Sequence, residues 1–239
     1  MNRGTIYNKD TFLTNVANQL GRKRQTSSVS LPKWKKSPQY NVFSELSEDA
    51  LLDEFVKQCE AIHTEVIVTE MKELNKVCEQ VIHDLGGESL VYWEDPRFIK
   101  YGIDSVLEKK RQTGMDIYEW ASTKGAFNIE KAERANIGLT FSDVTLAESG
   151  TVVLFSDKGK GRSVSLLPKT YMAIIPKSTL VPRMTQATDI IHERIKAGEK
   201  PPSCINFISG PSNSADIELR LVVGVHGPVR VTYVVIEDE

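Results

Sequence analysis

Short apolar segments alternate with helical segments along most of the chain, and this alternation constrains the fold most. Residues 65–69 (EVIVT) and 89–93 (SLVYW) are predicted to be buried strands, and each follows a segment with apolar residues at helical spacing. Further strands are predicted at residues 116–120, 137–140, 151–155, 170–175, 205–209 and 229–236. Such alternation is typical of an α/β fold with helices on the faces of a sheet.

The predicted helices have recognisable ends. The first begins after Ser47 as N-cap and buries one face, formed by Leu51, Leu52, Phe55, Val56, Cys59 and Ile62. The second, over residues 71–85, ends at Gly86 and Gly87. A third is predicted over residues 184–196.

A basic segment precedes this pattern. A short helix is predicted to begin with Asp10 as its N-cap and to end at Gly21, and no acidic residue occurs over residues 11–44. The basic residues there are Arg22, Lys23, Arg24, Lys33, Lys35 and Lys36. Serines and prolines among them are typical of a linker.

The chain is therefore divided into a helix and basic linker arm, residues 1–44, and an α/β domain, residues 45–239. We expect the basic arm over residues 22–36 to be a solvated segment that docks on the domain or on a second copy in a homo-oligomer. Nucleic-acid binding by the arm is the alternative, and the net charge of −2 gives no overall attraction to nucleic acid or to an anionic membrane.

The cysteines predict a reducing compartment and no metal cluster. Cys59, Cys78 and Cys204 are odd in number, lie far apart and form no C-x-x-C pair, so they do not supply the four thiolates of an iron–sulfur cluster. The N-terminal residues have no apolar core of the signal-peptide kind, and no apolar run is long enough for a membrane span. We expect a bacterial-style cytoplasmic protein that binds no metal and no cofactor.

Loops next to strands are the places where ligands bind in open α/β sheets, and three such loops contain candidate residues. In the first, Glu148 is flanked by small residues and can act as a nucleophile or general base. A turn glutamate bonded to backbone amides is the alternative. The neighbouring candidates for ligand binding are Ser149, Gly150 and Thr151.

The second loop follows the predicted strand 205–209 and is expected to open a helix, so that its backbone N–H groups bind an anion. Its candidate residues are Ser209, Gly210, Ser212, Asn213, Ser214, Asp216 and Glu218. Plain helix capping by Asn213 and Asp216 is the alternative.

The third loop, Gly224 to Gly227, holds His226 between glycines, where an imidazole can approach a ligand or simply bond the backbone. In addition, residues 159–162 (GKGR) combine two glycines, interpreted as mobile, with Arg162, a cation suited to a carboxylate or phosphate. An exposed hairpin tip would have the same sequence pattern.

Several common enzyme classes have no support in the sequence. The phosphate-binding pattern G-x-x-x-x-G-K-[ST] and the dinucleotide-binding pattern G-x-G-x-x-G are absent. So are the metalloprotease H-E-x-x-H and the hydrolase G-x-S-x-G.

Three blocks carry a resemblance to a known family: residues 138–154 (GLTFSDVTLAESGTVVL), 165–176 (SLLPKTYMAIIP) and 209–228 (SGPSNSADIELRLVVGVHGP). They closely resemble the lactate utilization protein C (LutC/YkgG) family, and the likeness runs from about residue 1 to residue 236. The resemblance implies the three-layer α/β/α fold of the NagB/RpiA/CoA-transferase-like superfamily. It also implies a role in a bacterial system that oxidises L-lactate to pyruvate with two iron–sulfur partner proteins, so that lactate serves as a carbon source.

Two functions stay open. In the first, the chain is a non-redox component of that system and its loops form a pocket for a small carboxylate or other anionic ligand, held by Arg162 or by the amides of residues 209–214, with His226 nearby. In the second, the chain is an enzyme of the CoA-transferase, isomerase or formyltetrahydrofolate cyclo-ligase type with Glu148 catalytic. The loop around Glu148 resembles the glutamate loop of CoA transferases, but Ser149 stands where that loop usually has asparagine.

Overall fold

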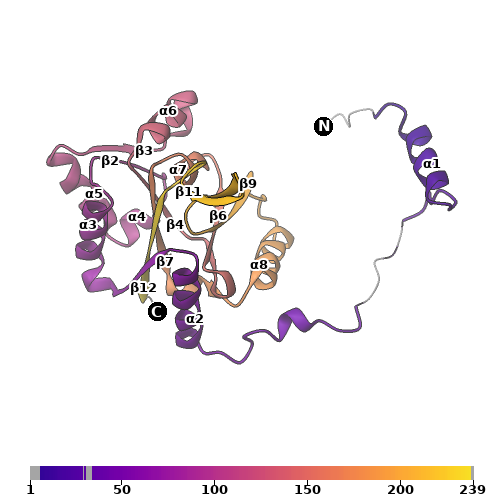
Figure 1. Ribbon diagram of the computed structural model, residues 1–239, viewed down its shortest axis with the longest axis horizontal. Coiled ribbons are helices and arrows are strands. Elements are labelled where there is room, and N and C mark those ends of the chain that lie inside the picture. The colour runs from indigo at the N-terminus through magenta and orange to yellow at the C-terminus, as the bar shows by residue number, and fades with distance from the viewer. Residues whose placement is uncertain (1–5, 29, 31–33, 238–239) are drawn as a thin grey trace. The chain divides into compact units, whose positions relative to one another are not determined.

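The computed structural model describes residues 6–28, 30 and 34–237 and separates two compact units, residues 1–37 and 38–239 (Figure 1). In the first unit, helix α1 (Lys9–Gln19) follows Asn8, whose backbone is left-handed with φ of 57°. The prediction that Asp10 is the N-cap is wrong: Asp10 lies in the first helical turn, and its carboxylate is bound by the Arg24 guanidinium. The predicted end at Gly21 is confirmed, since Gly21 adopts a positive φ just beyond the helix.

The second unit is built on a six-stranded sheet in the order β1-β12-β7-β4-β2-β3, with every neighbouring pair parallel. We call it the main sheet. Its strands are β1 (Glu65–Glu70), β2 (Ser89–Tyr92), β3 (Asp116–Glu119), β4 (Ile137–Phe141), β7 (Thr170–Pro176) and β12 (Arg230–Glu237). Every residue of β4 and β7 is buried, as expected of parallel strands covered on both faces. The α/β fold is confirmed.

Helices cover both faces of this sheet. The helices of this unit are α2 (Glu48–Ala61), α3 (Leu74–Asp84), α4 (Arg97–Lys100), α5 (Ile103–Gln112), α6 (Ala126–Arg134), α7 (Ser163–Leu166) and α8 (Met184–Lys196), of which α8 packs on a second sheet. In Figure 1, α3 and α5 lie on one face, and α2 lies on the other together with a second sheet. The Ser47 side chain accepts a hydrogen bond from the Ala50 N–H, so the predicted N-cap of α2 is confirmed. The predicted bounds of α8 are also confirmed.

The second sheet has the order β8-β5-β6-β9, formed by β5 (Val144–Leu146), β6 (Thr151–Ser156), β8 (Leu180–Val181) and β9 (Cys204–Ser209). Strand β6 pairs antiparallel with both β5 and β9. Val153 and Phe155 of β6 pack with Ala187 of α8 in a small core of their own. Through these contacts β6 attaches α8 to the second sheet.

Every predicted strand is present, and its observed ends differ from the predicted ends by at most one residue. The predicted helix after Ser209 is wrong. That segment forms a hairpin of β10 (Asn213–Ile217) and β11 (Arg220–Val223). Glu218 and Leu219 connect them with φ of 51° and 60°, so both adopt the left-handed conformation that a tight two-residue hairpin turn requires. The backbone N–H groups of β10 are consequently directed to strand pairing and not to a helix N-terminus.

Within the described residues, no helix is both long enough and apolar enough to cross a membrane.

Gly138 of β4 allows the closest backbone approach in the core. A Cβ atom at this position would lie 1.9 Å from the Val164 carbonyl oxygen of α7, which no rotamer change relieves. We expect Gly138→Ala to lower the free energy of unfolding by about 3 kcal/mol, measured by urea denaturation. The matched control is Gly227→Ala, whose new Cβ would lie 3.2 Å from the Ser212 Cβ and 3.4 Å from the Leu166 carbonyl oxygen, with an expected loss below about 1 kcal/mol. Equal losses for the two variants would contradict this account.

Candidate functional site

The winding of the main sheet changes direction between β2 and β4. The chain continues from β2 to β3 on one side and from β4 to β7 on the other, although β2 and β4 are neighbours. At such a point the connections diverge and leave a crevice at the carboxyl ends of the strands, where α/β proteins bind ligands. The residues that follow β2 and β4 therefore define the candidate site.

A buried ion pair lies directly after β2. The Asp95 side chain is 1% exposed, and its carboxylate accepts hydrogen bonds from Arg97 Nε at 3.0 Å and Arg97 Nη2 at 2.6 Å. The Arg97 backbone N–H also donates to Asp95 Oδ1, at 2.9 Å. Arg97 thus stands in a fixed position at the start of α4, with its guanidinium directed towards β4.

Asp143, after β4, and Lys160, in the loop after β6, complete this network. Arg97 Nη2 lies 2.8 Å from Asp143 Oδ1, and Lys160 Nζ lies 2.9 Å from Asp95 Oδ2 and 3.8 Å from Asp143 Oδ1. The other Asp143 oxygen accepts the Phe155 N–H of β6 at 2.7 Å. Two carboxylates and two cations balance one another, and we call these four residues the ion network.

The ion network controls the protonation of Asp95. Burial acts to raise the pKa of Asp95, but the hydrogen bonds and charge of Arg97, together with Lys160, lower it to about 2. Burial likewise acts to lower the pKa of Arg97, and Asp95 and Asp143 more than offset this. Both groups are therefore charged at neutral pH, and Asp95 is not available as a general base.

The loop over residues 157–161, which we call the lysine loop, is fixed by two indoles. Trp93 Nε1 donates to the Gly161 carbonyl at 2.9 Å, and Trp120 Nε1 donates to the Lys158 carbonyl at 3.1 Å. A Cβ at Gly161 would lie 2.1 Å from the Trp120 ring, and one at Gly159 would lie 2.9 Å from the Glu94 carbonyl oxygen. The two glycines are thus explained by close packing and not by the mobility inferred from sequence.

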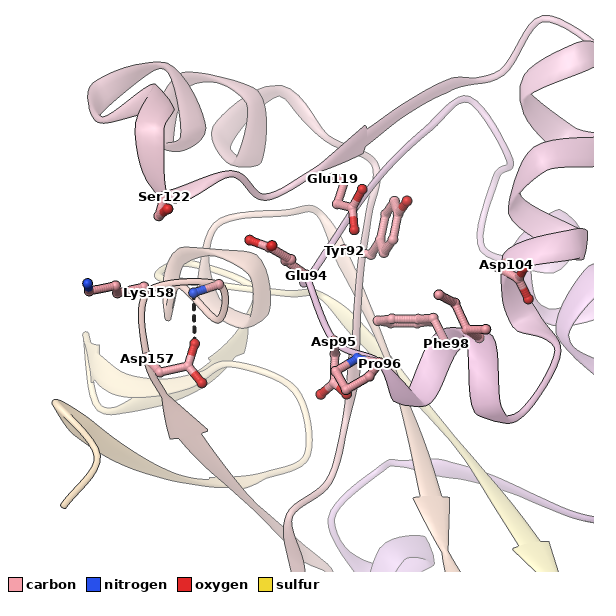
Figure 2. Close-up of a pocket in the computed structure, with 12 residues that line it drawn as sticks. Tyr92, Glu94, Asp95, Pro96, Phe98, Asp104, Glu119, Ser122, Asp157 and Lys158 are labelled. Carbon is pink, nitrogen blue, oxygen red and sulfur yellow. Dashed lines mark hydrogen bonds between the residues drawn. The ribbon is translucent and has the colours of Figure 1, made fainter. Parts of the chain in front are cut away.

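Two cavities flank the lysine loop. The first, of about 770 Å³, lies over the ends of β2 and β3, and Figure 2 shows Tyr92, Glu94 and Glu119 around it. Its wall is rich in carboxylates, contributed by Glu94, Asp95, Asp104, Glu119 and Asp157. We call it the acidic cavity.

The second cavity, of about 500 Å³, lies between the lysine loop and the segment that joins α8 to β9. Its wall is rich in cations, contributed by Lys158, Lys160, Arg194 and Lys200, beside the carboxylates of Asp143 and Asp157. Phe155, Ser156, Pro201, Pro202 and Ser203 complete the wall. We call it the basic cavity.

Glu148 lies at the other end of β6, outside both cavities. Its two carboxylate oxygens accept hydrogen bonds from Arg183 Nε and Nη2, both at 2.7 Å. Strand β6 has six residues, so the cavities lie about 17 Å from the Glu148 loop along the strand. Glu148 is therefore paired with a cation and separated from the crevice.

Three hydroxyl candidates do come together beside Glu148. Thr151 Oγ1 lies 2.7 Å from Ser149 Oγ and 2.6 Å from Ser209 Oγ, because β6 and β9 pair at this point. Gly150 and Gly210 pack closely against the end of α2, where a Cβ on Gly150 would lie 3.0 Å from Cys59 Sγ. These residues connect β6 and β9 to α2.

The remaining candidates lie around the hairpin and α7. Ser212 accepts the Gly224 N–H at its carbonyl, at 2.8 Å, and the His226 N–H at its hydroxyl, at 3.3 Å. Gly227 packs against Ser212, and the His226 side chain is exposed. The placements of the others differ: Asn213 donates to the Pro211 carbonyl, Ser214 is buried, Glu218 is in the turn, Arg162 is exposed before α7, and the side chain of Asp216 lies outside the described residues. None of these residues is in the wall of either cavity.

Sequence reasoning did not select Asp95, Arg97, Asp143 or Lys160 as site residues. Asp95 lies in none of the three candidate loops, and in residues 159–162 Arg162, not Lys160, is the candidate cation. The available signal was position, since Asp95 and Asp143 follow two buried strands. Only the strand order shows that those strands are neighbours.

The comparisons with known proteins agree with this fold. The family model described as LUD domain matches residues 52–236, which includes all of the main sheet except Glu237, the last residue of β12. The chain belongs to the LUD domain family. It is 55% identical to a protein named Lactate utilization protein C from Geobacillus sp. (strain WCH70), over all of this chain and 99% of that protein. It is 51% identical to one of the same name from Bacillus subtilis (strain 168), over the full length of both.

A solved structure shares the LUD domain fold. It is the crystal structure of a DUF162 family protein from Deinococcus radiodurans, with a TM-score of 0.55 over 80% of this chain and 99% of that one. The sequence identity is 17%, so this likeness supports the fold alone.

The contribution of Asp95 to stability should depend on pH. Its folded-state pKa of about 2 lies below the ordinary 3.8, so the contribution is present above about pH 4 and is lost as the pH falls towards 2. We expect Asp95→Asn to lower the free energy of unfolding by about 2–3 kcal/mol at pH 7, because Arg97 and Lys160 lose a buried partner. The difference from wild type should shrink below pH 4 in urea denaturation.

The control for this experiment is Asp116→Asn. Asp116 pairs with Lys131 at 3.0 Å, but its side chain is 64% exposed. Its loss should therefore change the free energy of unfolding by less than about 1 kcal/mol. A stable Asp95→Asn variant at pH 7 would show that the ion network does not stabilise the fold.

Proposed function

We propose that this chain is a component of a bacterial L-lactate utilization system that supports the oxidation of L-lactate to pyruvate. The observation that carries the proposal is the identity of 51–55%, over essentially full length, with proteins named Lactate utilization protein C. Identity at this level over the whole chain includes both the core and the loops. It therefore supports a shared role more strongly than the fold alone does.

In this proposal two iron–sulfur partner proteins carry the electrons, and the chain itself does not. The support comes from its three cysteines, which are too few for a four-thiolate cluster. Burial raises the pKa values of the Cys59 and Cys78 thiols to about 12, so both are core residues and not thiolate ligands. The free state of all three thiols also supports the cytoplasmic location proposed for the chain.

The contacts of Glu148 support this role over that of a separate enzyme with a glutamate nucleophile. A nucleophilic carboxylate needs a free oxygen directed at its substrate. Here Arg183 holds both oxygens, and the Glu148 N–H donates to the Pro182 carbonyl at 3.0 Å. We infer that Glu148 joins the β5–β6 turn to the start of α8.

Growth on lactate tests the proposal. We expect cells that lack this gene to lose growth on L-lactate as sole carbon source, and wild type to restore it. Glu148→Gln should restore it as well, because the amide oxygen still accepts from Arg183 and a partly exposed ion pair contributes about 1 kcal/mol or less. The measurement is lactate consumption, with protein abundance checked by immunoblot.

Two results would change the conclusion. Undiminished growth of the deletion strain on lactate would contradict the proposed role. An abundant Glu148→Gln protein that fails to restore growth would instead favour the enzyme of CoA-transferase, isomerase or cyclo-ligase type with Glu148 catalytic.

A further inference from the structure

We propose that the basic cavity is a binding site for a short-chain organic acid, whose carboxylate is held by Lys158 and Lys200. The ligand class rests in part on the proposed function, since lactate and pyruvate are short-chain acids. The site itself rests on the geometry of the cavity. None of the residues selected from the sequence is in the wall of this cavity.

The charges in the wall favour an anion. Both oxygens of Asp143 are already bound, one by Arg97 and the other by the Phe155 N–H. Asp157 Oδ1 accepts the Gly159 N–H at 2.7 Å within the lysine loop. The carboxylates in the wall are thus engaged by other groups, at least in part.

The cations are less fully compensated. Lys160 is paired with Asp95, and Arg194 with Glu199 at 2.7 Å. Among the described residues, neither Lys158 nor Lys200 has a carboxylate within ion-pair distance. Two uncompensated ammonium groups in one wall provide a charge-assisted site for a carboxylate.

The position of Lys158 is set by the backbone. Trp120 holds the Lys158 carbonyl, and the Glu94 N–H donates to the Gly159 carbonyl at 3.0 Å. Figure 2 shows the Lys158 side chain extending away from Glu94 and Glu119, two of the carboxylates of the acidic cavity. A fixed loop reduces the entropy lost when a ligand is bound.

The rest of the wall suits a small organic body. The Phe155 ring lies beneath the Arg194 guanidinium, 5.2 Å from ring centroid to Cζ, and Pro201 and Pro202 add apolar surface. The Ser156 hydroxyl accepts from Asn206 Nδ2 at 3.4 Å, so its proton can be donated to a hydroxyl or keto oxygen. The Ser203 hydroxyl donates to the Ser156 carbonyl at 3.1 Å, so it can only accept from a ligand hydroxyl. Two lysines, an apolar surface and hydroxyls in one wall together match a hydroxy- or keto-carboxylate.

The test is binding of L-lactate, pyruvate and inorganic phosphate to the purified full-length chain, measured by isothermal titration calorimetry at low ionic strength. We expect L-lactate and pyruvate to bind more tightly than phosphate, and we expect added salt to weaken the binding of both acids. The double variant Lys158→Gln/Lys200→Gln should bind at least about tenfold more weakly, as expected when charged hydrogen-bond donors are removed. The matched control is Lys196→Gln, on α8 outside the cavity wall, which should bind as wild type does.

Three results would overturn the site: no binding of either carboxylate, equal binding by the double variant, or tighter binding of phosphate than of both acids. Growth on lactate separates this proposal from the proposed function. Absence of binding by a chain that restores growth rejects the site and leaves the role in lactate utilization. Binding that depends on Lys158 and Lys200, in a chain whose deletion leaves growth on lactate unchanged, supports the site and rejects the role.

Discussion

The ion network of Asp95, Arg97, Asp143 and Lys160 determines how the carboxyl edge of the main sheet is assembled. Through Asp95 and Arg97 it joins the ends of β2 and β4, and through the Phe155 N–H and Lys160 it attaches both to β6 of the second sheet. A buried network of this kind contributes little net free energy compared with an apolar core, but removing one member leaves an uncompensated charge. It therefore fixes one arrangement of the two sheets more than it adds to overall stability.

Much of the fold could be predicted because the parallel strands are buried on both faces and so consist of apolar runs. The helices that sequence reasoning missed bury few apolar residues. In α5 only Ile103, Val106 and Leu107 are buried, among many charged residues. In α6 the buried side chains are Ala132 and Asn128, and Asn128 bonds the Tyr118 hydroxyl and the backbone of Ala121. An inward polar residue breaks the apolar periodicity on which helix prediction depends.

The candidate site was harder to predict because its residues are brought together by strand order. Loops rich in small residues, such as residues 209–214, were predicted to bind an anion. In the structure their glycines pack closely against neighbouring segments and their hydroxyls bond between paired strands. Asp95 and Lys160 are far apart in sequence, and nothing local distinguishes either from a turn residue or a surface cation. Periodicity reports which residues are buried, whereas the site depends on which strands are neighbours.

The lysine loop contributes one lysine to the ion network and another to the walls of the cavities. Lys160 points into the ion network and is neutralised there, while Lys158, two residues earlier, lines both cavities without a carboxylate partner among the described residues. Because glycines flank Lys160, the loop can approach Glu94 and Trp120 closely enough for the indole hydrogen bonds that fix it. The contacts that neutralise one lysine thus place the other at the boundary between an acidic and a basic cavity. An anion that enters this crevice is repelled by the carboxylates on one side of the loop and attracted by the cations on the other, so the charge pattern selects the cavity that it occupies.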